Sequence, residues 1–147
     1  MRHTLRCLLT AAALVAGTLP ALAEKSFTRD ELESGAIRLE KSLEGEAARP
    51  GEAAQLRKDA DAALAAKNFE ALGEIAGRLV LLNPRDWTSW TRLSVAFSGL
   101  TPADWQAKNE ARRNAHAAAY RAYRLAPGPR EEALALTTLA NSYVSEE

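Results

Sequence analysis

Apolar residues recur at three- and four-residue intervals along most of the chain from residue 28 onward, which is the spacing of an amphipathic α-helix. Capping residues, prolines and glycines divide this pattern into about six predicted helices. Because the predicted turns between most of them are only a few residues long, we expect consecutive helices to pack as antiparallel hairpins. The sequence therefore predicts an all-α protein.

Capping residues and helix breakers give the bounds of the first three predicted helices. Thr28 and Glu31 form a capping box at the start of the first helix, and Asn68 is placed to cap the third. Arg49-Pro50-Gly51 breaks the first helix and Asn83-Pro84 stops the third, and the second runs from about Glu52 to Ala66. The residues expected to face the core are Leu32, Ala36, Leu39 and Leu43, then Leu56, Ala60, Ala63 and Leu64, then Phe69, Leu72, Ile75, Ala76 and Leu79.

The last three helices are bounded in the same way. Asp86 caps the fourth, which ends at Gly99. Thr101-Pro102-Ala103-Asp104 opens the fifth with a cap, a proline at the first helical position and an acid in the first turn. We expect the fifth helix to continue to Ala126, a length of about 40 Å. The inward residues of the fourth helix are Trp87, Trp90, Leu93 and Phe97, and Pro127-Gly128-Pro129 precedes a last helix from Arg130 to about Ser145.

Composition supports helices, because β-branched apolar residues are scarce. After residue 23, valine and isoleucine occur only at Ile37, Ile75, Val80, Val95 and Val144. Strands favour such side chains, whereas alanine, leucine, arginine and glutamate lose little on entering a helix.

Residues 53–86 form a 34-residue window that resembles a tetratricopeptide repeat. Its matching positions are Leu56 and Ala60 in the first helix, Phe69 at the start of the second, and Pro84 at the close. Residues 87–129 match a longer second unit, in which Trp90 lies on the motif's tryptophan, and 130–147 match part of a third. The resemblance implies a right-handed, tetratricopeptide-like stack. A plain helical bundle with coincidental spacing stays open as the alternative.

The first 23 residues are typical of a secretory signal peptide. A basic start at residues 2–6 precedes an apolar run, Cys7–Leu19, and Pro20-Ala21-Leu22-Ala23 ends in an Ala-x-Ala signature, which predicts cleavage after Ala23. The run is too short to span about 30 Å of hydrocarbon. We therefore expect a periplasmic or secreted protein without a membrane span after signal removal. Residues 24–51 would form an N-terminal capping helix and hinge, and 52–147 the tetratricopeptide-like domain.

Charge and sulfur content narrow the classes of function. The chain carries 19 basic and 19 acidic residues, and removal of residues 1–23 leaves 17 against 19, a net charge of −2. This balance argues against nucleic acid or anionic lipid as the main partner. The only cysteine and methionine, Cys7 and Met1, lie in the predicted signal peptide. The mature chain therefore has no disulfide, no thiolate nucleophile and no zinc–sulfur site.

Motifs for catalysis or cofactor binding are missing from the sequence. His116 is the only mature histidine, so Ser94, Ser98 and Ser142 have no second histidine to choose from. The sequence contains no Glu-x-x-His for a di-iron bundle, no Cys-x-x-Cys-His for haem and no glycine-rich phosphate loop. We expect no enzyme, no cofactor and no metal, and we expect His116 to be a partly exposed packing residue.

Two surface features have both a functional and a structural interpretation. The fifth helix is basic and the first is acidic, through Arg112, Arg113, Arg121 and Arg124 on one and Glu31, Glu33, Glu40, Glu44 and Glu46 on the other. These faces form either a basic site for an acidic partner or solvated ion pairs between helices, and we favour the latter. Trp105 is a second candidate contact for a partner, but we favour the alternative that it anchors the core beside Tyr120 or Trp90. A peptide groove, if present, would be lined by Arg57, Asp61, Thr88 and Thr91.

Four segments of the mature chain carry a resemblance to a known family. They are FTRDELESGAIRLEKSL (Phe27–Leu43), QLRKDADAALAAKNFEAL (Gln55–Leu72), DWTSWTRLSVAF (Asp86–Phe97) and RRNAHAAAYRAYRLA (Arg112–Ala126). In this order they resemble the helical N-terminal region of large secreted alpha-2-macroglobulin-like proteins of Gram-negative bacteria. The resemblance implies a helical module that precedes β-sandwich domains and a Cys–Glu–Gln thioester in periplasmic protease traps.

The present sequence stops at Glu147 with no sandwich domain and no mature cysteine. We therefore expect a stand-alone or truncated relative that binds another protein, or the remainder of a larger macroglobulin-like protein, without the trapping activity. The alternative is a stand-alone tetratricopeptide-like scaffold of a periplasmic envelope assembly. Self-association is also expected through apolar residues of the last helix, namely Leu134, Leu136, Leu139, Tyr143 and Val144.

Overall fold

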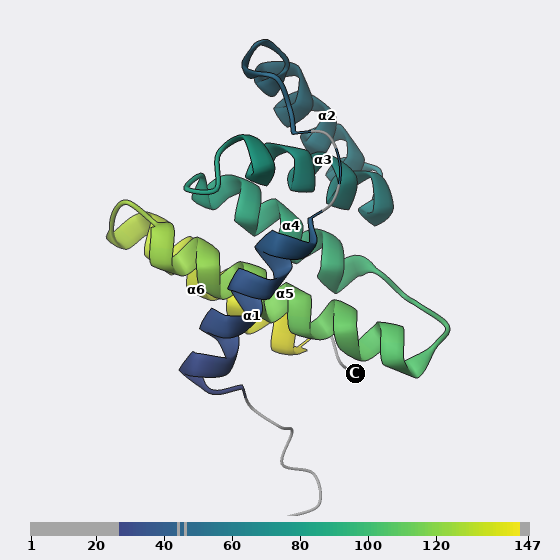
Figure 1. Ribbon diagram of the computed structural model, residues 1–147, viewed down its shortest axis with the longest axis vertical. Helices are drawn as coiled ribbons and strands as arrows, with labels where there is room; N and C mark the ends of the chain where they lie inside the picture. Colours follow the sequence, from purple (N-terminus) through teal and green to yellow (C-terminus); the bar gives the residue numbers. More distant parts are fainter. Residues whose placement is uncertain (1–26, 44, 46, 145–147) are drawn as a thin grey trace, which may run out of the picture.

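A computed structural model of the protein describes residues 27–43, 45 and 47–144, and the expected signal peptide with its cleavage after Ala23 lies outside them. Within these residues the chain forms six α-helices, one short 3₁₀ helix and no strand, which confirms the all-α prediction. The elements are α1 (Arg29–Ser42), η2 (Pro50–Glu52), α2 (Ala53–Ala65), α3 (Phe69–Leu82), α4 (Trp87–Gly99), α5 (Trp105–Leu125) and α6 (Pro129–Val144) (Figure 1).

Helices α2 to α6 stack in chain order, each packed against the helix before it, and α4 also touches α6 (Figure 1). Helix α1 does not extend this series but crosses over α5. Capping explains several of the observed starts: Thr28 and Glu31 form the predicted capping box, and the Asn68 and Asp86 side chains accept backbone N–H groups of α3 and α4. None of the described helices is both long enough and apolar enough to cross a bilayer.

The core is centred on Trp90, which is fully buried where five helices meet. Around it pack one or two small or branched side chains from each neighbour, namely Leu39, Ala76, Val80, Leu93, Ala118, Ala122 and Ala135. The alanines let α5 and α6 approach closely, and the Trp90 indole N–H donates to the Pro84 carbonyl at 2.8 Å. Trp90 therefore buries a large apolar ring without leaving its donor unsatisfied.

A buried hydrogen bond sets the register of α4 against α5. The Ser94 hydroxyl donates to the Ala115 carbonyl at 2.8 Å, and both residues are buried. Five residues of α4 follow Ser94, whereas ten residues of α5 precede Ala115. Because the two helices run antiparallel, the first turn of α5 extends about 7 Å past the end of α4.

Two predictions at the start of α5 are wrong. The helix begins at Trp105 and not at Thr101, because both carboxylate oxygens of Asp104 accept backbone N–H groups, from Gln106 at 3.2 Å and Ala107 at 3.0 Å. The helix is therefore 21 residues long, roughly 31 Å. The prediction that Trp105 anchors the core is wrong: the side chain is 74% exposed, since α4 does not reach it.

A third prediction fails at the end of α2. Leu64 was expected on the apolar face, but it is 40% exposed. Helix α2 is the outermost member of the stack and packs mainly against α3, so its buried face is narrow and consists of Ala53, Leu56 and Ala60. Leu64 lies on the last turn, where that face ends.

Candidate functional site

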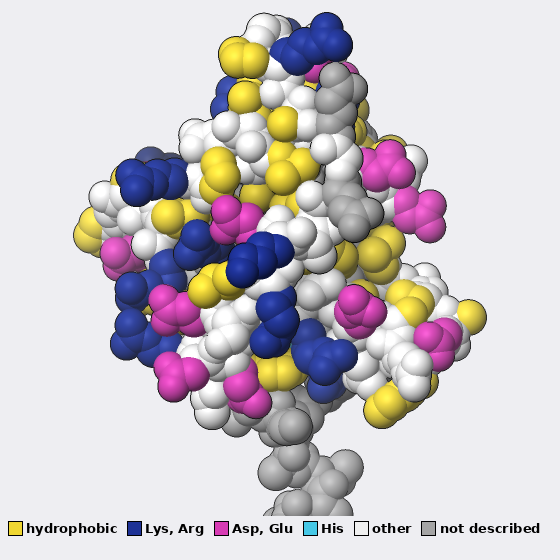
Figure 2. Space-filling model, in the orientation of Figure 1, with side chains coloured by type: hydrophobic (Ala, Val, Ile, Leu, Met, Phe, Trp, Pro, Cys, Tyr) yellow, Lys and Arg dark blue, Asp and Glu magenta, His cyan; other side chains and the backbone are white. Residues whose placement is uncertain are grey.

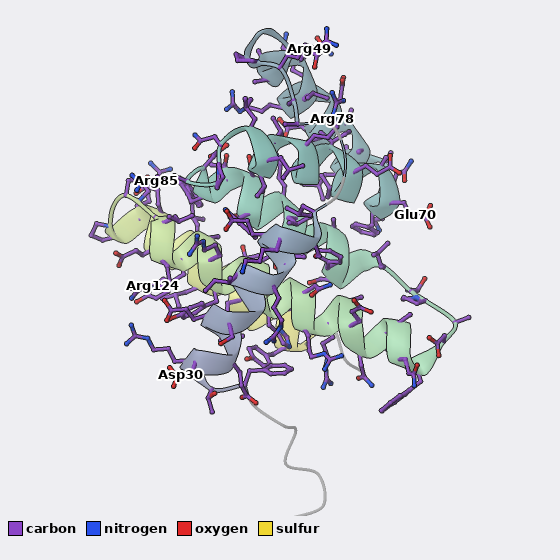
Figure 3. The ribbon with its side chains drawn as sticks, viewed as in Figure 1. Asp30, Arg49, Glu70, Arg78, Arg85 and Arg124 are labelled. Carbon is purple, nitrogen blue, oxygen red and sulfur yellow. The ribbon has the colours of Figure 1, made fainter. Side chains whose placement is uncertain are left out.

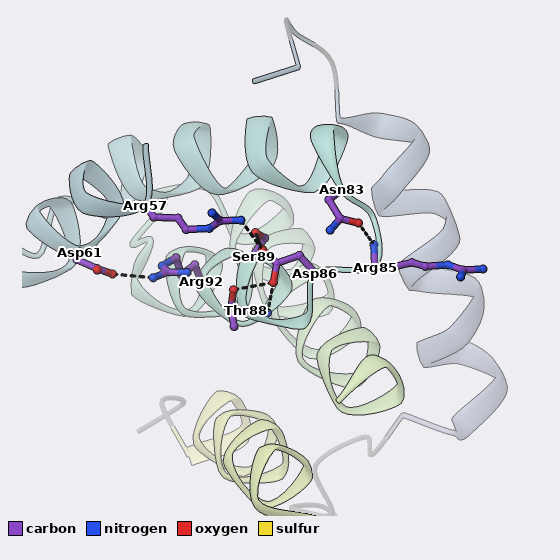
Figure 4. Close-up of polar contacts among 8 residues, drawn as sticks. All are labelled: Arg57, Asp61, Asn83, Arg85, Asp86, Thr88, Ser89 and Arg92. Carbon is purple, nitrogen blue, oxygen red and sulfur yellow. Dashed lines mark hydrogen bonds and ion pairs between the residues drawn. The ribbon is translucent and has the colours of Figure 1, made fainter. Parts of the chain in front are cut away.

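The structure brings together the four residues predicted to line a peptide groove, at the seam between α2 and α4 (Figure 4). Arg57 lies 3.7 Å from the Asp86 carboxylate, and the Asp61 carboxylate accepts a hydrogen bond from Arg92 at 2.8 Å. The two threonines bond within α4 and its cap: Thr88 Oγ1 donates to Asp86 Oδ1 at 2.7 Å, and Thr91 Oγ1 donates to the Trp87 carbonyl at 3.0 Å. All four side chains thus interact within the chain.

Asp86 is the main acceptor of this seam. Its carboxylate caps α4 through the Thr88 backbone N–H at 3.1 Å and also accepts the Ser89 hydroxyl at 2.7 Å. Burial would raise the Asp86 pKa, but the hydrogen bonds from Ser89 and Thr88, together with the Arg57 charge, lower the pKa below its usual value. The capping role was predictable from sequence, whereas the pairing with an arginine of α2 depends on how the helices pack.

His116 is fully buried, so the prediction of a partly exposed residue is wrong. Its ring stacks on Tyr143 with 3.9 Å between ring centres, and Phe27 of the segment before α1 lies 5.1 Å away. These two aromatic contacts come from opposite ends of the described chain. No local pattern around residue 116 could therefore predict them.

The His116 side chain also forms a short hydrogen bond, 2.6 Å from Nδ1 to the Ser142 hydroxyl oxygen. Because the Ser142 hydroxyl already donates to the Leu139 carbonyl at 2.7 Å, the imidazole Nδ1–H is the donor to Ser142. Burial and the nearby positive charge of Arg112 lower the His116 pKa to about 4, so the ring is neutral at pH 7.

This histidine–serine pair is arranged for packing. The Ser142 hydroxyl is buried and hydrogen-bonded to backbone, and the pKa of about 4 makes His116 a weak base. In residues 27–43, 45 and 47–144, no three His, Cys, Asp or Glu side chains are grouped so as to hold a metal ion. The absence of an enzyme activity and of a cofactor stays a prediction.

A groove of about 1000 Å³ opens between α1 and the N-terminal half of α5, and we call it the α1–α5 groove. The two helices approach closely at Gly35, where an added Cβ would lie 3.2 Å from the Ala117 Cβ. The groove reaches the extended first turn of α5, where the exposed Trp105 stands at its lip. Figure 2 shows basic side chains over α1 and beside it on this face.

The lining of the α1–α5 groove combines an apolar floor with a basic rim. Leu32, Leu39 and Ala117 lie on the floor and are buried. The basic members of the lining are Arg38, Arg112 and Arg113, and the acidic members are Glu31 and Glu110. The sequence indicates Trp105, Arg112 and Arg113 as separate features, but not Arg38 or the groove, because both depend on how α1 crosses α5.

The remaining charges of α1 and α5 follow the ion-pair interpretation in part. Arg121 pairs with Glu40 at 3.3 Å, both side chains are about one-third exposed, and the guanidinium lies 5.9 Å from the centre of the Trp90 ring. Arg124 is exposed on the same flank as Arg85 (Figure 3). Glu44 and Glu46 lie outside the described residues.

Comparison with known proteins gave no match to this chain among protein-family models, curated proteins or solved structures. The functional interpretation therefore rests on the residues and geometry described above.

Proposed function

We propose that this protein is a non-catalytic interaction module of the periplasm or the extracellular space, and that it is a relative of the N-terminal helical part of macroglobulin-like protease traps. The observation that supports a binding role is the α1–α5 groove, in which an exposed tryptophan and three arginines border an apolar floor. Tryptophan and arginine dominate the energetics of protein interfaces. The buried polar side chains Ser89, Ser94, His116 and Ser142, in contrast, form hydrogen bonds inside the fold.

The proposal covers binding and excludes covalent trapping by this chain. The thioester of the macroglobulin-like family requires a cysteine, and residues 24–147 contain none. A helical module of this kind would contact either the protease or the remaining domains of a macroglobulin-like protein. The order of the quoted segments supports this assignment.

Site-specific photo-crosslinking in the native host tests the proposal. A benzoylphenylalanine at position 105 is compared with one at the exposed position 58 of α2, which does not line the groove. Crosslinking to a protease or to a macroglobulin-like protein supports the proposal. Crosslinking to a cell-wall or outer-membrane complex supports the rival function, a stand-alone scaffold of an envelope assembly. A third benzoylphenylalanine at the exposed position 136 probes α6. Failure to crosslink any protein from positions 105, 58 and 136 refutes an interaction function.

We also propose self-association through one flank of α6. Leu134 and Leu136 are 52% and 46% exposed, but they lie about 200° apart around the helix, on opposite sides of the buried Ala135. Leu136 continues an exposed apolar stripe with Ala133 and Ala140, at helical spacing. Tyr143 packs on His116, so it does not contribute an exposed ring.

A further inference from the structure

The α1–α5 groove has a charge and shape that specify the chemistry of its occupant. We propose that it binds an acidic peptide segment of a partner protein, in which carboxylates flank an apolar or aromatic side chain. This inference rests on the proposed interaction function and names the surface and the partner chemistry. It concerns a different face from the α2–α4 seam that sequence spacing had suggested.

The basic rim of the groove provides the charge complementarity. Arg38 on α1 and Arg113 on α5 are exposed, and neither forms an ion pair with any described residue. Of the two acidic residues in the lining, Glu31 is already committed, because its carboxylate accepts the Thr28 backbone N–H at 2.8 Å and the Thr28 hydroxyl at 3.0 Å. The guanidinium groups therefore present donors in the planar arrangement that binds carboxylates.

The apolar part of the groove accounts for the second half of the proposed motif. Leu32, Leu39 and Ala117 form a floor that an inserted side chain would cover, and the Trp105 ring stands free at the lip. A tryptophan that is 74% exposed is unusual, since burying its large ring is strongly favourable. A peptide lying along the rim would bury this ring while its carboxylates meet Arg38 and Arg113.

A peptide fits these features better than an anionic membrane surface. Polybasic segments that bind anionic lipids present clusters of four to eight basic residues. Here the basic residues border a concavity of about 1000 Å³ with an apolar floor, within the size range of specific ligand sites. Binding to lipid in place of a peptide would therefore refute the proposal.

The experiment is a selection from a random peptide display library against the immobilised full chain. We expect the enriched peptides to be acidic, with at least one apolar or aromatic residue between the acids. Their affinities are then measured by fluorescence anisotropy for the wild type, for the double variant Arg38→Gln/Arg113→Gln, and for Trp105→Ala. Each variant is expected to weaken binding by about tenfold or more. Both variants should keep the wild-type stability, since all three side chains are exposed.

The matched control is Lys58→Gln/Arg130→Gln, which removes the same charge from exposed positions outside the groove. We expect it to bind the selected peptides as the wild type does, apart from a small non-specific effect that salt removes. Equal losses in the two double variants would overturn the proposal, as would enrichment of peptides without net negative charge. Binding of phosphatidylglycerol vesicles that depends on Arg38 and Arg113, without peptide binding, would also overturn it. If a protein partner crosslinks from position 136 and not from 105, the groove proposal fails while the interaction function survives.

Discussion

Acidification should destabilise this protein through His116, because the folded and unfolded states bind a proton at this side chain with different affinities. The buried ring has a pKa of about 4, whereas the unfolded chain has the ordinary value of 6.5. Between pH 6.5 and 4 the His116 ring is protonated in the unfolded state and neutral in the folded state. The free energy of unfolding therefore falls as the pH decreases from 6.5 to 4, and His116 contributes its full stabilisation only above this window.

The size of the effect follows from the width of the window. Each pH unit inside it removes about 1 kcal/mol, so that the loss reaches on the order of 2 to 3 kcal/mol by about pH 4.5. For a domain of this length that is a large part of the total stability. Two causes lower the His116 pKa: burial of the ring, to which the contacts with Tyr143 and Phe27 contribute, and the positive charge of Arg112.

The assay is urea unfolding followed by tryptophan fluorescence at about pH 7.5 and about pH 4.5, for the wild type and for His116→Phe. Phenylalanine keeps a ring against Tyr143 but cannot take up a proton, and the Ser142 hydroxyl keeps its bond to the Leu139 carbonyl. We expect the wild type to lose on the order of 2 to 3 kcal/mol more than the variant between the two pH values, since all other titrating groups are shared.

A second variant and an independent measurement complete the test. Ser142→Ala removes the hydrogen-bond partner but keeps the titrating ring in its aromatic surroundings, so it should retain most of the pH dependence. In NMR spectra of the folded wild type, the His116 ring should stay neutral down to about pH 4. A pH dependence that is the same in wild type and His116→Phe, or a ring that titrates near 6.5 in the folded protein, would refute the reasoning.

Three further outcomes are expected. Gly99→Ala should destabilise the fold by about 1–3 kcal/mol, because an added Cβ would lie 2.3 Å from ring atoms of Phe69; unchanged urea unfolding would contradict this packing. The matched control Gly73→Ala places its Cβ at an ordinary 3.6 Å from Ala96, so it should stabilise α3 by about 0.5–1 kcal/mol in the same assay. Leu136→Glu should abolish concentration-dependent self-association in light scattering, whereas Leu134→Glu should not; a wild type that is monomeric at all concentrations would remove α6 as a contact surface.

Most helix bounds were predictable from the sequence because they depend on contacts within a few residues. Thr28, Asn68 and Asp86 cap their helices through side-chain bonds to backbone two or three positions away, and the predicted starts of α1, α3 and α4 are confirmed. The start of α5 was misplaced because Thr101 and Asp104 are competing caps. Only Asp104 accepts two backbone N–H groups.

The exposure of individual side chains on those helices required the tertiary structure. Periodicity identifies the apolar face of a helix, but it contains no information on how far the neighbouring helix extends. The Ser94–Ala115 hydrogen bond sets the register that leaves Trp105 uncovered, and the aromatic contacts that bury His116 come from residues 27 and 143.

For the candidate site, too, the sequence provides the residue types and the tertiary structure decides which of them lie together. Residue types and helix assignments for Trp105, Arg112 and Arg113 were available from the sequence, as was the exclusion of thiol chemistry from residues 24–147. That these residues line one groove together with Arg38 depends on how α1 crosses α5, which only the tertiary structure shows. Local hydrogen bonds and helix propensity act over a few residues and are written in the sequence, whereas crossing geometry and register result from packing between segments distant in the chain.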